Sequence, residues 1–201
     1  MPIFSVDGKR VLFIHVPKTG GMALARHLSP YMAERFDTQP PGLPVRLLPR
    51  HFHAAPLEAM LDAGMFDWVF MVVRHPADRL VSEYRYQKRK PWKPRLSFGP
   101  WLRLALWRRR LDPYYRDNHF RPQTEFECFG AEVFRYEDGL ERVVAALNQR
   151  IGTDLPVAIV RENVSRSAKV EVGDRERALI EQAYAEDYRR YGYAAGGQKT
   201  R

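Results

Sequence analysis

The sequence predicts an α/β fold in which helices flank a central parallel sheet. Short apolar runs rich in β-branched residues alternate with segments of helical character along the chain. The run Trp68–Val73 is apolar at every position, which is typical of a parallel strand covered on both faces. The run Val11–Val16 stops at Pro17, as a buried strand does where it enters a tight loop. Ligands bind beyond the carboxyl ends of strands in such sheets, so the loops after these two runs are the first candidates for a site.

The other elements follow from capping residues and from apolar spacing. A third strand is expected over Ala131–Tyr136. Ser97 and Asp174 are candidate helix caps, because their side-chain oxygens can accept hydrogen bonds from amides of the first turn. Helices are expected, in chain order, at about Met22–Leu28, Leu57–Ala63, Pro76–Tyr86, Trp101–Leu111, Leu140–Arg150 and Asp174–Arg190, with an irregular connection at Pro40–Pro44.

Length and composition restrict the class of protein. The chain of 201 residues corresponds to one domain, expected over residues 1–195, with a disordered tail at 196–201. Hydrophobic residues make up 45% of it, enough for a packed core, so wholesale disorder is excluded. No apolar run reaches the roughly 18 residues of a membrane helix, and the start at Met1 lacks signal-peptide regions, so a soluble, cytoplasmic protein is expected. Cys128 is the only cysteine, which excludes an intramolecular disulfide and disfavours a cysteine-based zinc site.

Positive charge is concentrated in one part of the chain. The formal charge is +9, and residues 85–116 hold eleven Lys or Arg against the single acid Asp112. Three of the four tryptophans, Trp92, Trp101 and Trp107, lie in the same stretch. A local surface of this kind indicates contact with an anionic partner, although a solvated basic helix and loop would have the same composition.

The segment after the first strand has the residues of an anion-binding loop. In Pro17-Lys18-Thr19-Gly20-Gly21, the glycine pair allows backbone amides to turn inward around an anion, and Lys18 adds a compact positive charge. The lysine precedes the glycines, whereas in a nucleotide P-loop it follows them. The alternative is a plain tight turn with an exposed lysine.

The segment after the second strand places an arginine where the strand leaves the core. A buried guanidinium is costly without an anion, so Arg74 is a candidate ligand for one. Ser82 follows about two helical turns later, on a helix that packs back over the strand. Arg79 and Asp78 are expected to pair with each other and to hold this loop.

Together, Phe13–Gly21 and Val72–Tyr84 resemble the PAPS-dependent sulfotransferase family, most closely its carbohydrate (Golgi-type) branch and bacterial relatives. The resemblance implies a P-loop-like three-layer sandwich with a central parallel sheet flanked by helices. It also implies that PAPS, a nucleotide with a 5′-phosphosulfate and a 3′-phosphate, donates a sulfuryl group. Further matches spread over nearly the whole chain, at Leu96–Phe98, Pro122–Thr124, Phe134–Asp138 and Asp187–Tyr193.

The resemblance assigns the donor site residue by residue. Arg74 and Ser82 would hold the 3′-phosphate, with Arg166 of the late segment Asn163–Lys169 as a weaker candidate. The family usually has Thr or Ser just after the glycine pair, where their hydroxyls bond phosphate, whereas this chain has Met22 and Ala23. Loss of two such hydrogen bonds, about 1.5–3 kcal/mol each, would weaken the binding of PAPS. The 5′-phosphosulfate would be held by the Lys18 ammonium and by the backbone of Thr19, Gly20, Gly21, Met22 and Ala23.

A sulfate acceptor must lose a proton, so a general base is expected near the donor. Several sulfotransferases use a histidine from the interval between the two motifs, where this chain has His51 and His53. We predict His53 as the base and His51 as a supporting or acceptor-binding residue, with Glu58 or Glu83 as alternatives. A His-x-His pair also suits a metal, but no carboxylate or cysteine lies at ligand spacing, so no metal is expected. His15 and His75 are expected to shape the loops.

The resulting hypothesis is an enzyme that moves a sulfuryl group from PAPS to a hydroxyl or amine, leaving PAP as the product nucleotide. The basic, tryptophan-bearing stretch would lie on the acceptor side and would suit a small-molecule or carbohydrate acceptor, including an anionic one. Two alternatives remain open at this point: a P-loop-like nucleotide kinase or other phosphotransferase, and an inactive relative that binds PAPS or another polyanion. No recognised nucleic-acid module matches the sequence.

Overall fold

A computed structural model of the chain describes residues 2–35, 47–90, 95–159 and 170–194. Four of the sequence-based predictions fall outside these ranges: Arg166 with its whole segment Asn163–Lys169, the connection Pro40–Pro44, Trp92, and the tail at 196–201. No helix in the described ranges combines the length and the apolar character needed to cross a bilayer.

The molecule is built on a five-stranded sheet with the strand order β3-β1-β2-β4-β5. The parallel strands β2, β4 and β5 correspond to the three that were predicted from the sequence. The prediction of a parallel sheet fails for β1, which runs antiparallel to both of its neighbours. The strands are β1 (Pro2–Val6), β2 (Lys9–Ile14), β3 (Met32–Arg35), β4 (Trp68–Val73) and β5 (Glu132–Arg135).

Strand β1 is joined to β2 by a tight hairpin turn. Asp7 and Gly8 occupy the turn with φ angles of 50° and 78°, the left-handed region that a two-residue hairpin requires. An Asp-Gly pair between two apolar runs is a known hairpin signal, so this strand could have been found in the sequence.

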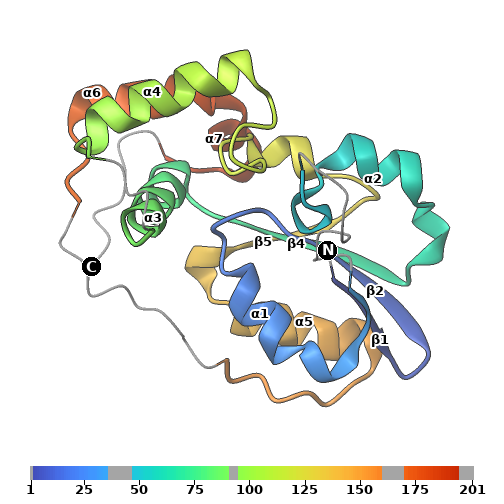
Figure 1. Cartoon of the computed structure of the whole chain (residues 1–201). Coiled ribbons are helices and arrows are strands. Elements are labelled where there is room, and N and C mark those ends of the chain that lie inside the picture. The colour runs from blue at the N-terminus through green and yellow to red at the C-terminus, as the bar shows by residue number, and fades with distance from the viewer. Residues whose placement is uncertain (1, 36–46, 91–94, 160–169, 195–201) are drawn as a thin grey trace.

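Helices cover both faces of the sheet, as Figure 1 shows. Alternate residues of β4 point to opposite sides because the side-chain period of a strand is two. Trp68, Phe70 and Val72 pack with α1 (Gly21–His27) and α5 (Glu141–Ile151) on one face. Val69, Met71 and Val73 pack on the other face with α2 (Ala54–Met60) and with the tyrosines around α7 (Ala185–Tyr191).

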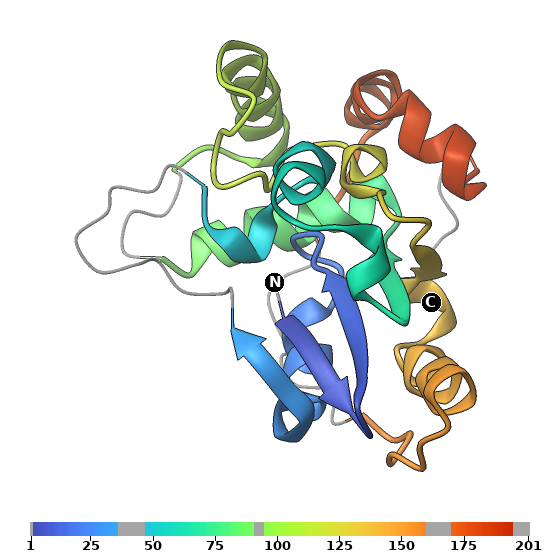
Figure 2. The same ribbon diagram turned by 90° about the vertical axis from the view of Figure 1, so that its right-hand side faces the viewer.

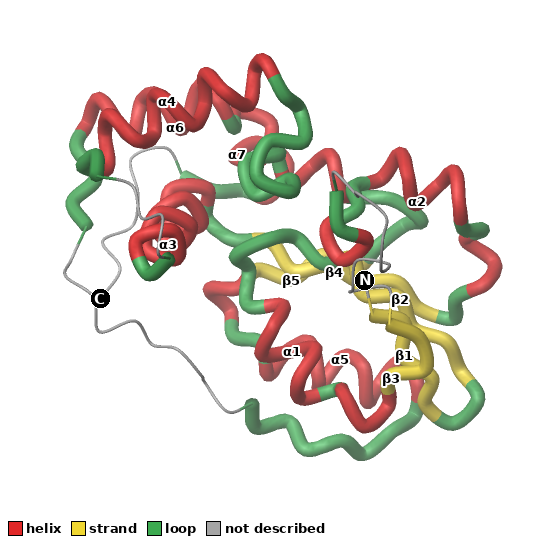
Figure 3. The backbone as a smooth tube through the Cα atoms, in the orientation of Figure 1, coloured by secondary structure: helices red, strands yellow, loops and turns green. Residues whose placement is uncertain are grey.

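Three further helices pack together beside the sheet. The helices α3 (Pro76–Lys88), α4 (Phe98–Leu111) and α6 (Asp174–Ala183) bury their apolar sides against one another. Figures 2 and 3 show this cluster from two sides, with α3 leading directly out of β4. The cluster therefore covers the end of the sheet at which the β2 and β4 strands finish.

Three predicted boundaries need correction. The helix expected at Leu57–Ala63 is α2, which begins earlier, at Ala54. The last helix is divided into α6 and α7 at Tyr184, whose φ and ψ of −125° and 27° are not helical. Ser97 occupies the N-cap of α4 without a side-chain capping bond, and Gly173, rather than Asp174, is the N-cap of α6.

Candidate functional site

The β2 loop (residues 15–20) connects β2 to α1 and has an unusual backbone. Lys18 and Gly20 adopt φ angles of 71° and 87°, and the left-handed region is costly for a residue such as lysine. The Thr19 hydroxyl donates to the Val16 carbonyl at 2.9 Å, which closes the turn from inside. A Cβ on Gly21 would lie 2.3 Å from Cδ2 of the buried His15 ring, so only glycine fits there.

The Lys18 side chain lies over an aromatic ring and among other cations. Its Nζ is 4.3 Å from the centre of the Tyr86 ring, and Lys90 Nζ lies 4.6 Å from the same centre. Burial lowers the pKa of Lys18; the Glu83 carboxylate opposes this effect, and Arg89, Arg74 and Lys90 add to the lowering. A bound anion would relieve this repulsion.

The β4 loop (residues 74–75) is held by side chains from distant parts of the chain. The Gln123 amide accepts from the Arg74 backbone N–H at 2.8 Å and donates to the Arg74 carbonyl at 2.8 Å. The Asp187 carboxylate, 0% exposed, accepts in turn from the Gln123 N–H and the Gln123 side chain. It also accepts from the backbone and hydroxyl of Thr124. This Asp187–Gln123 network fixes the backbone from which the Arg74 guanidinium extends.

The two loops meet at the Arg74 guanidinium. Its Nη1 lies 3.4 Å from the Lys18 carbonyl, and its Cζ lies 4.5 Å above the Tyr136 ring. Among the described residues, no hydrogen-bond partner is found for the buried Nε of Arg74 or for either ring nitrogen of His75. Buried polar groups of this kind are candidates for contact with a ligand. Ser82 lies farther along α3 and is half-buried.

Arg79 has a different role from the one predicted. Its guanidinium is 1% exposed and donates to the carbonyls of Pro17, His119 and Arg121 at 3.1, 3.0 and 2.8 Å. The predicted pairing with Asp78 is therefore wrong. A buried guanidinium needs acceptors, and three backbone carbonyls provide them. Arg79 thus ties the β2 loop to the segment that contains His119.

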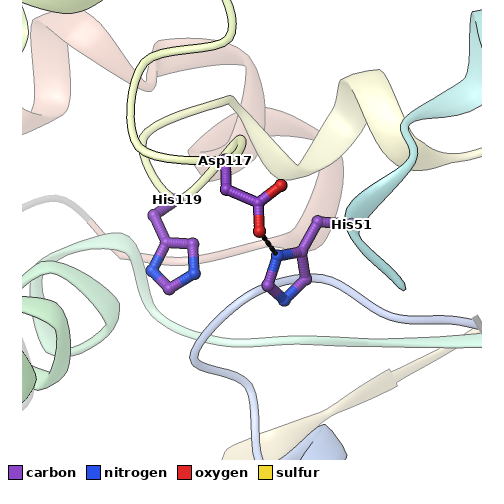
Figure 4. Close-up of side chains that lie close together, drawn as sticks. All are labelled: His51, Asp117 and His119. Atoms are coloured by element: carbon purple, nitrogen blue, oxygen red, sulfur yellow. Dashed lines mark hydrogen bonds and ion pairs between the residues drawn. The ribbon is translucent and has the colours of Figure 1, made fainter. Parts of the chain in front are cut away.

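A cluster of histidines lies next to the β2 loop (Figure 4). The Asp117 carboxylate projects between two imidazoles, and its Oδ2 is 2.6 Å from His51 Nδ1. The His51 ring centre is 5.0 Å from that of His119 and 5.3 Å from that of His15. On its other side, His119 Nδ1 lies 2.6 Å from Oε2 of the buried Glu83.

Asp117 and His119 were not predicted as site residues. Asp117 lies within residues 116–118, which all have positive φ, between 55° and 62°, and His119 directly follows this run. Such a run cannot be read from local sequence, since it depends on contacts made elsewhere in the fold. The one available signal was the Asp-Asn pair at 117–118, because these residues tolerate the left-handed region better than most.

Burial keeps the histidines uncharged at neutral pH. It lowers the pKa of His51 to about 4, against the opposing effect of Asp117, and it lowers the pKa of His15 and His53 as well. His53 is placed by Asn118, whose Nδ2 lies 3.3 Å from His53 Nδ1 and donates to the His51 carbonyl. An uncharged imidazole can accept a proton, so either His51 or His53 has the form that a general base requires.

The same cluster has the donor types of a divalent metal site. Ligand atoms of His51, Asp117 and His119 lie within 4.8 Å of one another, and two imidazoles with a carboxylate suit several transition metals. However, His51 and Asp117 already pair with each other, and Arg50 adds positive charge to the His51 surroundings.

The two glutamates proposed as alternative bases occupy different environments. Glu83 is buried between His119 and Gln87; burial alone would raise its pKa, but these partners and Lys18 outweigh burial and lower it. Glu83 therefore remains ionised as the partner of His119. Glu58 lies exposed on α2, on the side of the sheet where Cys128 is buried.

Comparison with known proteins assigns the chain to a family. The family model described as "Sulfotransferase family" matches residues 2–194, nearly the full length of the chain. No curated protein and no solved structure matches it. The phosphotransferase alternative gains no support from this result. Because the match includes both loops and the segments that hold them in place, the chain belongs to the sulfotransferase family.

Proposed function

We propose that this sulfotransferase uses PAPS as its donor and transfers the sulfuryl group to a hydroxyl or amine of an acceptor. The observation that carries the proposal is the meeting of two cationic loops, in which Arg74 Nη1 lies 3.4 Å from the Lys18 carbonyl. A donor with anionic groups at both ends requires two such anchors close together. The β2 loop would then act as a P-loop-like cradle, with its lysine ahead of the glycines.

The residues of the two loops fit such a donor. The amides of Gly21 and Met22 belong to the first turn of α1, where helix geometry leaves N–H groups without carbonyl partners. The Ala23 N–H already donates to the Gly20 carbonyl, so this amide contributes less than the sequence suggested. On the β4 side, the unpartnered Arg74 Nε is available to a phosphate, and Ser82 is the second candidate there. When bound, PAPS supplies an activated sulfuryl group on a good leaving phosphate.

For the general base, the contacts favour His51 over His53, contrary to the preference drawn from the sequence. His51 has an orienting carboxylate at 2.6 Å, the arrangement that holds an imidazole in one tautomer with its other nitrogen free. Its ring also touches His15, which underlies the β2 loop. We assign proton abstraction from the acceptor to His51 Nε2 and give His53 a supporting role.

Lys18 supplies the charge that the transfer requires. Sulfuryl transfer resembles phosphoryl transfer in that catalysis is mostly positioning and neutralisation of developing charge. The Lys18 ammonium would stabilise the negative charge that grows on the leaving oxygen. The acceptor would approach from the side of His51 and His53, where Arg121 lies over the Tyr114 ring at 5.5 Å. Rings and cations of this kind suit a carbohydrate or an anionic small molecule.

The decisive experiment replaces Lys18 and measures transfer of labelled sulfate from PAPS. We expect Lys18→Ala to lower the rate by about 10²–10³-fold, the usual cost of losing one electrostatic stabiliser. The matched control is Lys9→Ala at the opposite end of β2, where Lys9 donates only to the Ile151 carbonyl. Residual activity above about a tenth of the parent rate would overturn the assignment of Lys18.

The base is identified by comparing His51→Ala with His53→Ala. The variant that loses the base should lose about 10²–10⁴-fold in kcat while its affinity for PAP, followed by thermal stabilisation, stays close to that of the parent. Asp117→Asn should reproduce part of the His51 effect. A loss in kcat confined to His53→Ala would return the role to His53.

Stabilisation by PAP without any turnover of PAPS would instead identify an inactive binding relative.

A further inference from the structure

Helix α4 exposes a continuous apolar stripe. Trp107 is 56% exposed and Leu111 is 67% exposed, while Pro100 is exposed and Leu104 is half-buried. At about 100° per residue, these four positions fall within an arc of roughly 60° on the helix surface. They therefore form one line along the helix rather than scattered apolar residues.

This stripe is separate from the packing side of the helix. Five residues of α4 are buried against α3 and α6, and this packing holds the helix in place: Phe98, Trp101, Leu102, Ala105 and Leu106. The exposed stripe adds nothing to that core. Contiguous exposed apolar surface marks sites of contact with proteins, ligands or membranes, so this stripe is a candidate contact surface.

Arginines border the stripe on both sides. Arg103 and Arg110 project about 70–90° to one side of its midline, and Arg108 lies about 70° to the other. All three are exposed, and the sequence of α4 contains no acidic residue. Within the described ranges, Arg103 and Arg110 form no ion pair. Arg109, by contrast, is turned inward, with its Cζ 6.0 Å from the Tyr184 ring centre and its Nη2 3.4 Å from Glu125.

We propose that this face of α4 docks on the surface of an anionic lipid bilayer. An apolar stripe with an indole, bordered by arginines, matches the helices that lie in the bilayer interface. The apolar residues would enter the boundary between headgroups and acyl chains, while the arginines contact lipid phosphates. A nucleic acid would instead place the cations at the centre of the contact. The proposal does not depend on the sulfotransfer chemistry, because the stripe includes no residue of the two loops.

The test measures binding of the full chain to vesicles by cosedimentation. One set contains phosphatidylcholine alone, and the other contains about 30% phosphatidylserine. We expect binding at least about tenfold tighter to the anionic vesicles, weakening as salt is raised. No preference for anionic vesicles would overturn the proposal.

Two double variants separate the apolar and the charged contributions. Trp107→Ala with Leu111→Ala, and Arg103→Glu with Arg110→Glu, should each weaken binding to anionic vesicles by about tenfold or more. The matched controls are Met60→Ala, which removes an apolar residue 63% exposed on α2, and Arg142→Glu on α5; both should bind as the parent does. Unchanged thermal unfolding verifies that the variants are folded.

Two other outcomes would overturn the proposal in favour of a different partner. Binding to heparin or to an oligonucleotide without binding to anionic vesicles would identify a polyanion surface. A concentration-dependent dimer that the Trp107→Ala, Leu111→Ala pair abolishes, again without vesicle binding, would identify a second copy of the chain as the partner.

Discussion

The β2 loop and the β4 loop present charges to the same place, but they are stabilised differently. The β2 loop makes contacts with its own neighbours in sequence, through the Thr19 hydroxyl on Val16 and the His15 ring against Gly21, and one distant side chain, Arg79, donates to its Pro17 carbonyl. The β4 loop is held from far along the chain by Gln123, by Glu137 and, through Gln123, by Asp187. Both loops can be recognised from short motifs, and contacts between sequence neighbours can be anticipated with them, whereas the distant residues that hold the β4 loop cannot.

The two loops also differ in where their energetic cost lies. The β2 loop contains a strained residue, because Lys18 has a φ angle of 71°. It rests on uncharged, buried histidines. The β4 loop has no left-handed residue but depends on a fully buried carboxylate. Each loop should therefore be destabilised by a different change: the β2 loop by acid and the β4 loop by loss of the buried carboxylate.

The largest effect is expected from Asp187→Ala. The substitution removes the acceptor from four donors of Gln123 and Thr124, and unsatisfied buried donors cost about 1–3 kcal/mol each. Because some of these donors can find water, we expect a loss of about 4 kcal/mol in the free energy of unfolding, measured with urea. Glu186→Ala is the matched control, since this neighbouring carboxylate is exposed and pairs only with Arg189 on the surface. A loss equal to that of the control would contradict the prediction.

The β2 loop should be the more sensitive of the two to acid. The folded protein holds the pKa of His51 at about 4, below the unfolded value of 6.5, so the unfolded chain binds a proton first as pH falls. The stability due to uncharged His51 is fully present above pH 6.5 and is lost between 6.5 and 4, by up to about 3 kcal/mol. Buried His15 acts in the same direction.

Urea unfolding at several pH values measures this dependence. His51→Gln should flatten the curve between pH 6.5 and 4, because the variant lacks the imidazole whose pKa burial lowers. An identical slope in the His51 variant would show that His51 is not the group responsible.

A smaller loss is expected from Gly21→Ala. Its Cβ would lie 2.3 Å from the buried His15 ring, which is stacked on Phe13 and cannot move away, so we expect a loss of about 2 kcal/mol. Gly99→Ala is the control, because its nearest atom, at 2.4 Å, is the end of the flexible Glu176 side chain. In the double variant with His15→Ala the clash disappears, so the two losses should sum to more than the measured total. Simple additivity would argue against the clash.

Much of the fold follows from local pattern. Trp68–Val73 was predicted with the bounds that β4 has, because every residue in it is apolar and both faces are buried. β1 was not predicted, although the Asp7–Gly8 turn is a hairpin signal. The break at Tyr184 could not be predicted, because the side chain is held by a long-range bond to the Phe120 carbonyl.

The residues of the candidate site also fall into two groups, those that lie in sequence motifs and those that act through distant contacts. Lys18, Arg74 and the His51–His53 pair were found because each lies in or near a recognisable motif. Asp117, Gln123 and Asp187 act through contacts with residues 49 to 66 positions away, and no local rule indicates those contacts. The pairing of Arg79 with Asp78 was wrong for the same reason, since adjacent charges suggested a local pair where the fold supplies distant carbonyls.

The smallest effect, and the one most specific to the β4 loop, is expected from Gln123→Ala. The substitution removes two hydrogen bonds from the Arg74 backbone, so the guanidinium loses its fixed position while Lys18 keeps its own. We expect the affinity for PAP to fall by about fivefold to tenfold, about 1 kcal/mol, measured by isothermal titration calorimetry. The control, Gln182→Ala, removes an exposed amide from α6 and should bind PAP as the parent does. If Gln123→Ala binds PAP normally although its stability falls, the network serves the fold alone and the β4 loop needs no positioning for its ligand.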